Sequence, residues 1–375
     1  MITLTNPGLK PFKELADQFA RNELAPQREE HDKYPFGPFF HGVITRAHEA
    51  GFLGIILPEY LGGIGQGTGA LCVILDSISR VDASLAGILF ITALAQQILM
   101  ETGAPDTIRK IAGNASKAEE SLIAFPSFAN PSELAPSVFA KKEDGRYTLF
   151  GTCDYLVLGG LARYGLVPAR IHGRKGYSFF IVDLASPGVT KSGTVVSLGF
   201  HACPAVDVSI KDVEGTIAGD VEEGAALFER AAEKMHVAAA AIACGIMKGS
   251  FAEAQSYAKE RFQGGREIVK WSEVRMILAN MAVKVDIADM AVAVTCRAVD
   301  EKLPGWESKS RAAAIRIQDD ACELTTDGIQ ILGGYGYMKD YGQEKRFRDA
   351  KQVQALLGMA PMKKLKYVEQ VMAGG

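Results

Sequence analysis

The sequence predicts an α+β fold in three parts: an N-terminal helical domain (residues 1–119), a middle antiparallel β-domain (120–221) and a C-terminal four-helix bundle (222–375). Apolar residues recur at helical spacing in the first and last parts, whereas the middle part alternates apolar and polar positions between turn signals. The length of 375 residues also favours more than one domain, since a domain typically has roughly 150 residues.

Several helical stretches are expected in the N-terminal domain. The spacing of apolar side chains predicts helices over Pro11 to Leu24 and over Phe39 to Ala50. Ala70 to Met100 is a longer apolar stretch, which we interpret as two helices joined near Val81-Asp82-Ala83-Ser84. Asp82 or Ser84 could cap the second helix, because both side chains accept hydrogen bonds from backbone N–H groups of a first helical turn.

One of these helices has the composition of a membrane span. Ala83 to Met100 is uncharged over 18 residues, close to the lower limit for crossing a bilayer. It contains Ser84, Thr92, Gln96 and Gln97, however, and no Trp or Tyr flanks it. Helices at the centre of large bundles are also apolar nearly all round. We therefore interpret this stretch as a buried bundle helix and expect no membrane span.

The middle domain carries hairpin and strand signals. Asp144-Gly145 separates Val138-Phe139-Ala140 from Tyr147-Thr148-Leu149-Phe150, which is a strong short-range signal for a β-hairpin. Tyr177 to Val182 is a continuous apolar strand candidate. The apolar residues between Val206 and Ile210 alternate with polar ones, as in a strand with one face in water.

The C-terminal domain returns to the helical period and keeps it almost to the end. Long helices are expected over Gly224 to Phe262, Arg266 to Val299 and Ser308 to Leu332, with a short one near Met362 to Met372. Helices of this length joined by short connections typically pack as an antiparallel bundle.

Composition excludes several classes of function. The chain has 41 basic and 44 acidic residues, so its net charge of −3 gives no general electrostatic reason to bind nucleic acid. The six cysteines and six histidines are dispersed, so neither a metal site nor a disulfide framework is expected, and the thiols should be free and mostly buried. Because the N-terminus lacks a signal or transit pattern, we expect a cytoplasmic location.

The most specific motif is Asp327-Gly328-Ile329-Gln330-Ile331-Leu332-Gly333-Gly334-Tyr335-Gly336-Tyr337. Three glycines in four residues let the backbone pass close to a ligand and present its N–H groups. A glycine-rich helix stop would also produce such a segment. The motif is accompanied, however, by Phe347-Arg348-Asp349-Ala350 downstream and by Glu260-Arg261-Phe262-Gln263-Gly264-Gly265-Arg266 upstream.

With these motifs and the helix–sheet–helix order, the chain resembles the acyl-CoA dehydrogenase family over nearly its whole length. The resemblance implies FAD bound between the β-domain and the C-terminal bundle, in dimers that pair into tetramers. It also implies an oxidoreductase reaction on acyl-CoA thioesters, in which the α-proton and a β-hydride leave and electron-transfer flavoprotein takes the electrons.

The resemblance assigns cofactor contacts to several residues. Arg261 matches the arginine of the R-x-Q-F-G motif of the family, and Gln263 matches its glutamine. Arg261 would reach the FAD pyrophosphate of the neighbouring subunit, and Gln263 is a further cofactor-binding residue. An arginine suits a diphosphate because its planar fork gives two charge-assisted hydrogen bonds. The same pyrophosphate would be met by the segment Gln330, Ile331, Leu332, Gly333 and Gly334.

The β-domain departs from the family pattern. The Pro-Gly-x-Gly-Ser-Asp loop of the family corresponds to Phe125 to Glu133, which keeps a proline and Ser132-Glu133 but has no glycine. Tyr155 stands where the family has a Trp and could pack on the flavin ring in its place. Val157 stands where a threonine hydroxyl reaches flavin N5, and a valine has no hydroxyl.

The catalytic base is also missing. Taking a proton α to a thioester needs a nearby carboxylate with a raised pKa. The usual glutamate position is occupied by Leu357, and an alternative position on the long opposite helix by Met235. The aspartate position used with cyclic substrates falls at Phe90, Ile91 and Thr92. His236 is a weak candidate for a substitute base, and the backbone N–H at Leu357 could still polarise a thioester carbonyl.

Three functions therefore remain open. The chain could be a FAD-dependent oxidoreductase of acyl-CoA or enoyl-CoA thioesters with a non-standard or missing base. It could instead be a non-catalytic subunit of a heteromeric acyl-CoA dehydrogenase, because residues that would serve the FAD of a neighbour are kept while those serving its own are lost. A flavin monooxygenase of the same fold is the third. The assembly would be a homotetramer or a heterotetramer with a related chain.

Overall fold

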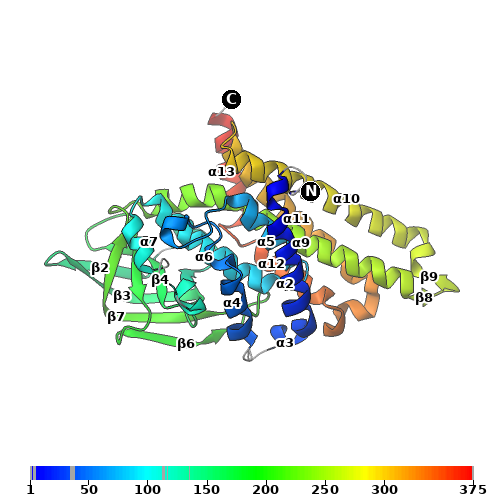
Figure 1. The fold of residues 1–375 in the computed structure, drawn as a ribbon, viewed down its shortest axis with the longest axis horizontal. Coiled ribbons are helices and arrows are strands. Elements are labelled where there is room, and N and C mark those ends of the chain that lie inside the picture. The colour runs from blue at the N-terminus through cyan, green and yellow to red at the C-terminus, as the bar shows by residue number, and fades with distance from the viewer. Residues whose placement is uncertain are drawn as a thin grey trace.

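The computed structural model describes residues 2, 6–33, 39–111, 115, 117–134 and 136–373. Figure 1 shows a β-domain at one end of the longest axis and long helices that run from it to the other end. The order is helices, strands and helices, as expected from the sequence. The two longest helices are α9 (Gly224–Glu260) and α10 (Ser272–Asp300).

The N-terminal part is helical, and its two central helices are buried. Asp82 accepts a hydrogen bond from the Ser84 amide at 2.8 Å, so of the two expected caps Asp82 begins the second central helix. The stretch predicted from Pro11 contains an α-helix that continues as a π-helical turn through Leu24. The helices are α2 (Lys10–Phe19), α3 (Arg28–Asp32), α4 (Phe39–Glu49), α5 (Thr68–Ser79), α6 (Ala83–Glu101), α7 (Pro105–Ile111) and α8 (Ala118–Ser121).

Among the described residues, two helices are long and apolar enough to cross a membrane by length and composition, and both are mostly buried in the fold. In α6, 94% of the most apolar window is buried, and in α9 83% is buried. The prediction that Ala83 to Met100 is a buried bundle helix is therefore confirmed.

The middle part is a seven-stranded sheet that is mixed rather than purely antiparallel. The expected hairpin is present, with Glu143 opposite Arg146. However, β4 runs parallel to both β1 and β2, a long-range pairing that alternation along the chain does not reveal. Pairing of β3 with β7 closes the sheet on itself. The strands are β1 (Ile123–Pro126), β2 (Val138–Glu143), β3 (Arg146–Val157), β4 (Tyr164–Ile171), β5 (Tyr177–Asp183), β6 (Val189–Val195) and β7 (Ala205–Ala218).

The C-terminal part packs α9 and α10 with α11 (Trp306–Leu332), and the shorter α12 (Gln343–Val353) and α13 (Ala360–Ala373) lie against α11. Between α9 and α10 a two-stranded hairpin forms from β8 (Phe262–Gln263) and β9 (Arg266–Glu267), so α10 begins later than the sequence predicts. The glycines of α9 bring it close to α5. A Cβ on Gly245 would lie 2.3 Å from the Asp76 carbonyl oxygen.

Charged residues of α12 join the three parts. Lys345 Nζ is buried and donates to Asp82 Oδ1 at 3.0 Å and to Asp349 Oδ2 at 2.7 Å. Asp349 also accepts from the Phe200 amide at 2.8 Å. Arg348 pairs with Asp32 of the N-terminal part. The Phe347-Arg348-Asp349-Ala350 motif therefore holds the helical parts and the β-domain together.

Candidate functional site

The two motifs singled out in the sequence meet in space. The α9 and α11 helices pack along their lengths, and their C-terminal ends border one cavity of about 810 Å³, which we call the cradle. The cradle is lined by Tyr257, Arg261, Gln263, Gly264, Ile268, Trp271, Val274, Gln330, Ile331, Leu332, Gly333, Gly334, Tyr335 and Met338. The residues to which the resemblance assigns a pyrophosphate contact, Arg261 and the segment 330–334, are all in this set, and so is Gln263.

The three glycines that follow α11, of which Gly333 and Gly334 line the cradle, have different functions. Gly333 ends α11 with φ 56° and ψ −129°, a backbone conformation that is essentially restricted to glycine. Its N–H is used by the helix end, since it donates to the Gln330 carbonyl oxygen. A Cβ on Gly334 would meet no atom within 4 Å, so the protein interior does not require a glycine there. A Cβ on Gly336 would lie 2.5 Å from the Ile329 carbonyl oxygen, so Gly336 serves packing.

Arg261 lies directly after α9 and is exposed. Its amide donates to the Tyr257 carbonyl oxygen at 2.8 Å, and its guanidinium lies 5.6 Å from the centroid of the Tyr335 ring. The Tyr335 ring packs in turn against Tyr257 and Tyr341, with centroids 6.2 and 5.3 Å away. Within the described residues no ion pair engages Arg261, so an aromatic cluster positions a charge that remains available to an anion.

The hairpin beside Arg261 forms an aromatic wall that the sequence reasoning missed. Gly264 and Gly265 turn the chain with φ values of 66° and 84°. A Cβ on Gly264 would lie 2.9 Å from the indole of Trp271, so this glycine allows the Trp271 side chain to reach the cradle. Arg266 lies over the same indole at 4.2 Å. The glycine pair was a visible signal of this turn, but the indole contact is long-range.

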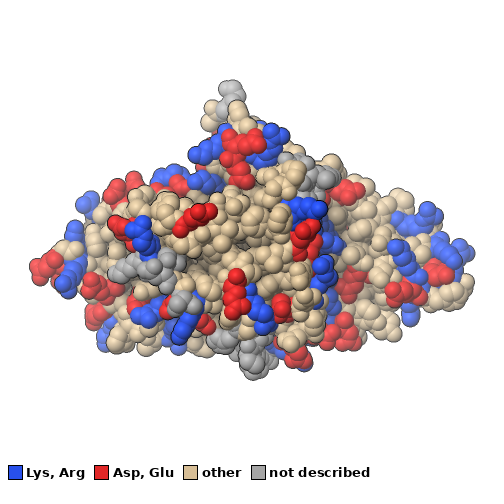
Figure 2. All heavy atoms as spheres, viewed as in Figure 1, with Lys and Arg blue, Asp and Glu red and all other residues tan. Residues whose placement is uncertain are grey.

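The cradle and the β-domain lie at opposite ends of the molecule. In Figure 1 the β8–β9 hairpin forms the right end of the long axis, and the large sheet forms the left end. On the face shown in Figure 2, basic side chains stand among acidic ones at the hairpin end. In and beside the hairpin, Arg261, Arg266 and Lys270 are exposed. One cofactor cannot therefore lie with its diphosphate in the cradle and its ring against the β-domain of the same chain.

The cradle fits the diphosphate of FAD. It combines a cationic fork at Arg261, two side-chain amides at Gln263 and Gln330, and an open position at Gly334. Charge-assisted bonds from an arginine to phosphate oxygens are among the strongest hydrogen bonds that proteins make. The aromatic and aliphatic wall offers apolar surface to the rest of a nucleotide.

The β-domain residues are arranged differently. Val157 is fully buried, opposite Phe125 in the β1–β3 pairing. Tyr155 is half-buried in a bulge of β3 with φ 53°, and burial raises the pKa of its hydroxyl. Ser132 is exposed, with its hydroxyl 3.4 Å from that of Tyr177. In the described residues these three side chains line no common cavity with the cradle.

The positions of the family base lie in the apolar core. Leu357 and Met235 are 3% and 2% exposed, and neither side chain can accept a proton. The Leu357 N–H, which the resemblance assigns to a thioester carbonyl, donates instead to the Phe128 carbonyl oxygen at 2.7 Å. Phe90, Ile91 and Thr92 are buried in α6.

His236 is fully buried, and in the part of the chain that the structure describes neither ring nitrogen has a hydrogen-bond partner. Burial lowers its pKa well below the ordinary value, and the positive charges of Arg311, Lys363 and Lys366 lower it further. Because a lower pKa means a weaker base, this environment weakens the histidine as a substitute for a carboxylate.

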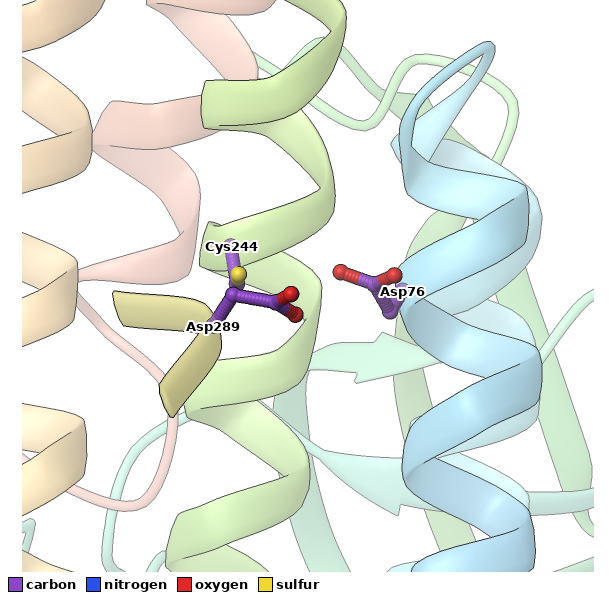
Figure 3. A group of neighbouring side chains, drawn as sticks. All are labelled: Asp76, Cys244 and Asp289. Carbon is purple, nitrogen blue, oxygen red and sulfur yellow. The ribbon is translucent and has the colours of Figure 1, made fainter. Parts of the chain in front are cut away.

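A second polar cluster lies between α5, α9 and α10. Figure 3 shows Asp76, Cys244 and Asp289 facing one another, and their ligand atoms lie within 4.8 Å. The cation between the carboxylates is the ammonium of Lys248, whose Nζ is 2.8 Å from Asp76 Oδ1 and 2.6 Å from Asp289 Oδ1. The carboxylates raise the pKa of Lys248 against the effect of burial. We interpret this cluster as a structural ion-pair network.

Comparison with known proteins identifies relatives along the whole chain. Residues 7–114 match the family model "Acyl-CoA dehydrogenase, N-terminal domain", and residues 222–368 match "Acyl-CoA dehydrogenase, C-terminal domain". A cyclohexane-1-carbonyl-CoA dehydrogenase of Geobacter metallireducens is 26% identical, over 98% of both chains. A 3-(aryl)acrylate reductase of Clostridium sporogenes is 27% identical, over 94% of this chain and 96% of the relative.

The fold is matched by solved structures. A chain in the structure reported for the electron transferring flavoprotein of Acidaminococcus fermentans superposes with a TM-score of 0.88, at 28% identity over 97% of both chains.

Proposed function

Because the chain belongs to the acyl-CoA dehydrogenase family, we propose that it works in an acyl-CoA dehydrogenase assembly, as the subunit that holds the FAD diphosphate of a related partner chain. Two observations carry this proposal. The cradle is separated from the β-domain along the long axis, and the base positions Leu357 and Met235 hold no carboxylate, which favours a related chain over a second copy of this one. A diphosphate bound in the cradle belongs to a flavin whose ring lies in another chain.

The residues of this chain bind and orient the cofactor. Arg261 donates to the diphosphate oxygens, and the tyrosine cluster beneath it limits where the guanidinium lies. Gln263 and Gln330 offer side-chain N–H donors from the two sides of the cradle. Gly334 leaves room for the phosphates. When bound, FAD supplies the hydride acceptor of the reaction.

The relatives support the chemistry of the assembly. One relative is named as a cyclohexane-1-carbonyl-CoA dehydrogenase, which supports an acyl-CoA thioester as the proposed substrate class. Another is named as a 3-(aryl)acrylate reductase, which supports reduction as the alternative direction of the reaction. The neighbour reported with an electron transferring flavoprotein supports such a protein as the redox partner.

Catalysis in the chain's own site is the alternative, and it requires a base. The three family positions for that base hold leucine, methionine and a segment without a carboxylate. The Leu357 amide is engaged by the protein, and His236 has a lowered pKa. These observations favour the supporting subunit over a relocated active site, and no observation favours a monooxygenase.

The test is to purify the chain together with a related acyl-CoA dehydrogenase chain that keeps the Pro-Gly-x-Gly-Ser-Asp loop, and to count FAD from its visible absorbance. Arg261→Ala in this chain should remove FAD from the assembly. Arg146→Ala, which changes an exposed arginine in the β2–β3 hairpin, should leave the FAD content unchanged. Full FAD content in the Arg261→Ala assembly would contradict the proposal.

A further inference from the structure

A loop of the β-domain contacts the C-terminal part of this chain where the resemblance places a flavin ring. Tyr155, on β3, corresponds to the residue that would pack on the ring, and the Leu357 amide to the donor beside it. The loop 126–134 lies between these two positions and contacts both.

The first contact is through the backbone of Phe128. Its carbonyl oxygen accepts the Leu357 N–H at 2.7 Å, a short and well-formed bond for an amide donor. An N–H has a single hydrogen, so this bond uses the donor that would otherwise face a ligand carbonyl.

The second contact is through the side chain of the same residue. Phe128 is 2% exposed. Its ring centroid lies 6.3 Å from that of Tyr155 and 5.8 Å from that of Phe200, both in edge-on arrangements. An aromatic ring of the protein itself therefore packs edge-on against Tyr155.

The third contact is a charge-assisted hydrogen bond at the other end of the loop. Glu133 Oε2 accepts the Met359 amide at 2.7 Å. A Cβ on Gly358 would lie 2.7 Å from Glu133 Oε1, and Gly358 has φ 126°, so a glycine is needed for this approach. Carboxylates make stronger hydrogen bonds to amides than neutral acceptors do.

The loop is also tied to α9. Asn130 Nδ2 donates to Glu229 Oε1 at 2.7 Å, while Asn130 Oδ1 accepts the Ser132 amide at 2.9 Å. Ser127 and Leu357, at the two sides of the closure, both adopt left-handed φ values, 62° and 65°. Such conformations cost energy in residues other than glycine and persist only where the surroundings enforce them.

From these contacts we propose that the loop 126–134 seals this chain's own flavin seat against residues 357–359, so that the chain accepts the diphosphate end of FAD in its cradle but takes no flavin ring in its β-domain. This inference deepens the proposed function, on which it rests. It predicts one FAD for each pair of this chain with a partner, rather than two.

Calorimetric titration of the purified full chain can measure binding of the diphosphate end and of the ring end of FAD independently. ADP, FAD and riboflavin are the probes. The seal predicts that FAD binds no more than about threefold more tightly than ADP, because the ring adds no contact, and that riboflavin does not bind. Riboflavin binding, or FAD binding more than about thirtyfold tighter than ADP, would overturn the inference. Failure of ADP to bind would instead count against the cradle, while the riboflavin result would still test the seal.

Hydrogen exchange tests the contacts themselves. Glu133→Ala removes the acceptor of the Met359 amide, and exchange of the amides between residues 355 and 361 should rise about tenfold. Glu143→Ala, an exposed carboxylate at the end of β2, is the matched control and should leave this exchange unchanged. Phe128→Ala should open the same segment by removing the ring. Unchanged exchange in both the Glu133→Ala and Phe128→Ala chains would refute the seal.

Discussion

Two glycines of the motif after α11, Gly334 in the cradle and Gly336 beside it, should respond in opposite ways to the same substitution. A Cβ on Gly336 would lie 2.5 Å from the Ile329 carbonyl oxygen and 2.9 Å from Ile329 Cα, both backbone atoms that cannot move aside alone. A Cβ on Gly334 would meet no atom within 4 Å. Alanine at these two positions therefore separates packing of the helix end from ligand binding.

The magnitudes follow from these distances. Gly336→Ala must push the turn away from α11, and overpacking of this kind lowers the free energy of unfolding by roughly 1–3 kcal/mol. Gly334→Ala should change it by less than about 0.5 kcal/mol, as an exposed substitution without a clash. In the cradle, however, the added methyl occupies space meant for phosphate. Loss of one charge-assisted hydrogen bond costs about 1.5–3 kcal/mol, or roughly ten- to a hundredfold in ADP affinity.

The assays are urea unfolding without nucleotide and calorimetric titration with ADP. We expect Gly336→Ala to lower the unfolding midpoint, and Gly334→Ala to keep the midpoint but weaken ADP binding. If Gly334→Ala unfolded as readily as Gly336→Ala, or bound ADP as tightly as the unchanged chain, the assignment of Gly334 to the diphosphate would be wrong.

Other predictions concern stability. Burial alone would raise the pKa of Asp32, but hydrogen bonds from His201 and Arg348 hold it well below its ordinary value. A carboxyl with a lowered pKa stabilises the fold above its unfolded pKa and loses that contribution as pH falls. Below about pH 5, the free energy of unfolding measured in urea should therefore fall less steeply for Asp32→Asn than for the unchanged chain. Lys248→Met leaves two partly buried carboxylates facing each other and should cost about 3 kcal/mol of unfolding free energy in urea titrations. Gly245→Ala forces α9 from α5 and should lower the melting temperature, whereas unchanged melting would refute the close contact.

Local patterns in the sequence were enough to predict much of the fold. Asp82 follows a break in a long apolar stretch and caps α6, and Asp144-Gly145 forms the β2–β3 turn. Both signals could be recognised because capping and turn formation depend on interactions between residues a few positions apart in the chain. The parallel pairing of β4 was not predictable in this way, because it joins strands that are distant in sequence.

In the candidate site, too, residues in short motifs could be predicted from the sequence, whereas long-range contacts could not. Arg261 and Gln330 could be singled out because each belongs to a short motif, and the structure brings both to one cavity. The acceptor of the Leu357 amide could not be predicted from the sequence, because it is the backbone carbonyl of Phe128 and a backbone group has no side-chain signature. The contact of Trp271 with Gly264 was missed because it depends on how a hairpin folds back on a helix end.

The most direct measurement is a structure of the assembly of this chain with a related acyl-CoA dehydrogenase chain, determined with FAD present. We predict that the diphosphate lies against Arg261 and Gly334 of this chain, while the flavin ring lies in the β-domain of the partner. A flavin ring found between Tyr155 and Leu357 of this chain, or an empty cradle beside an occupied partner site, would contradict the division of the two functions between the chains.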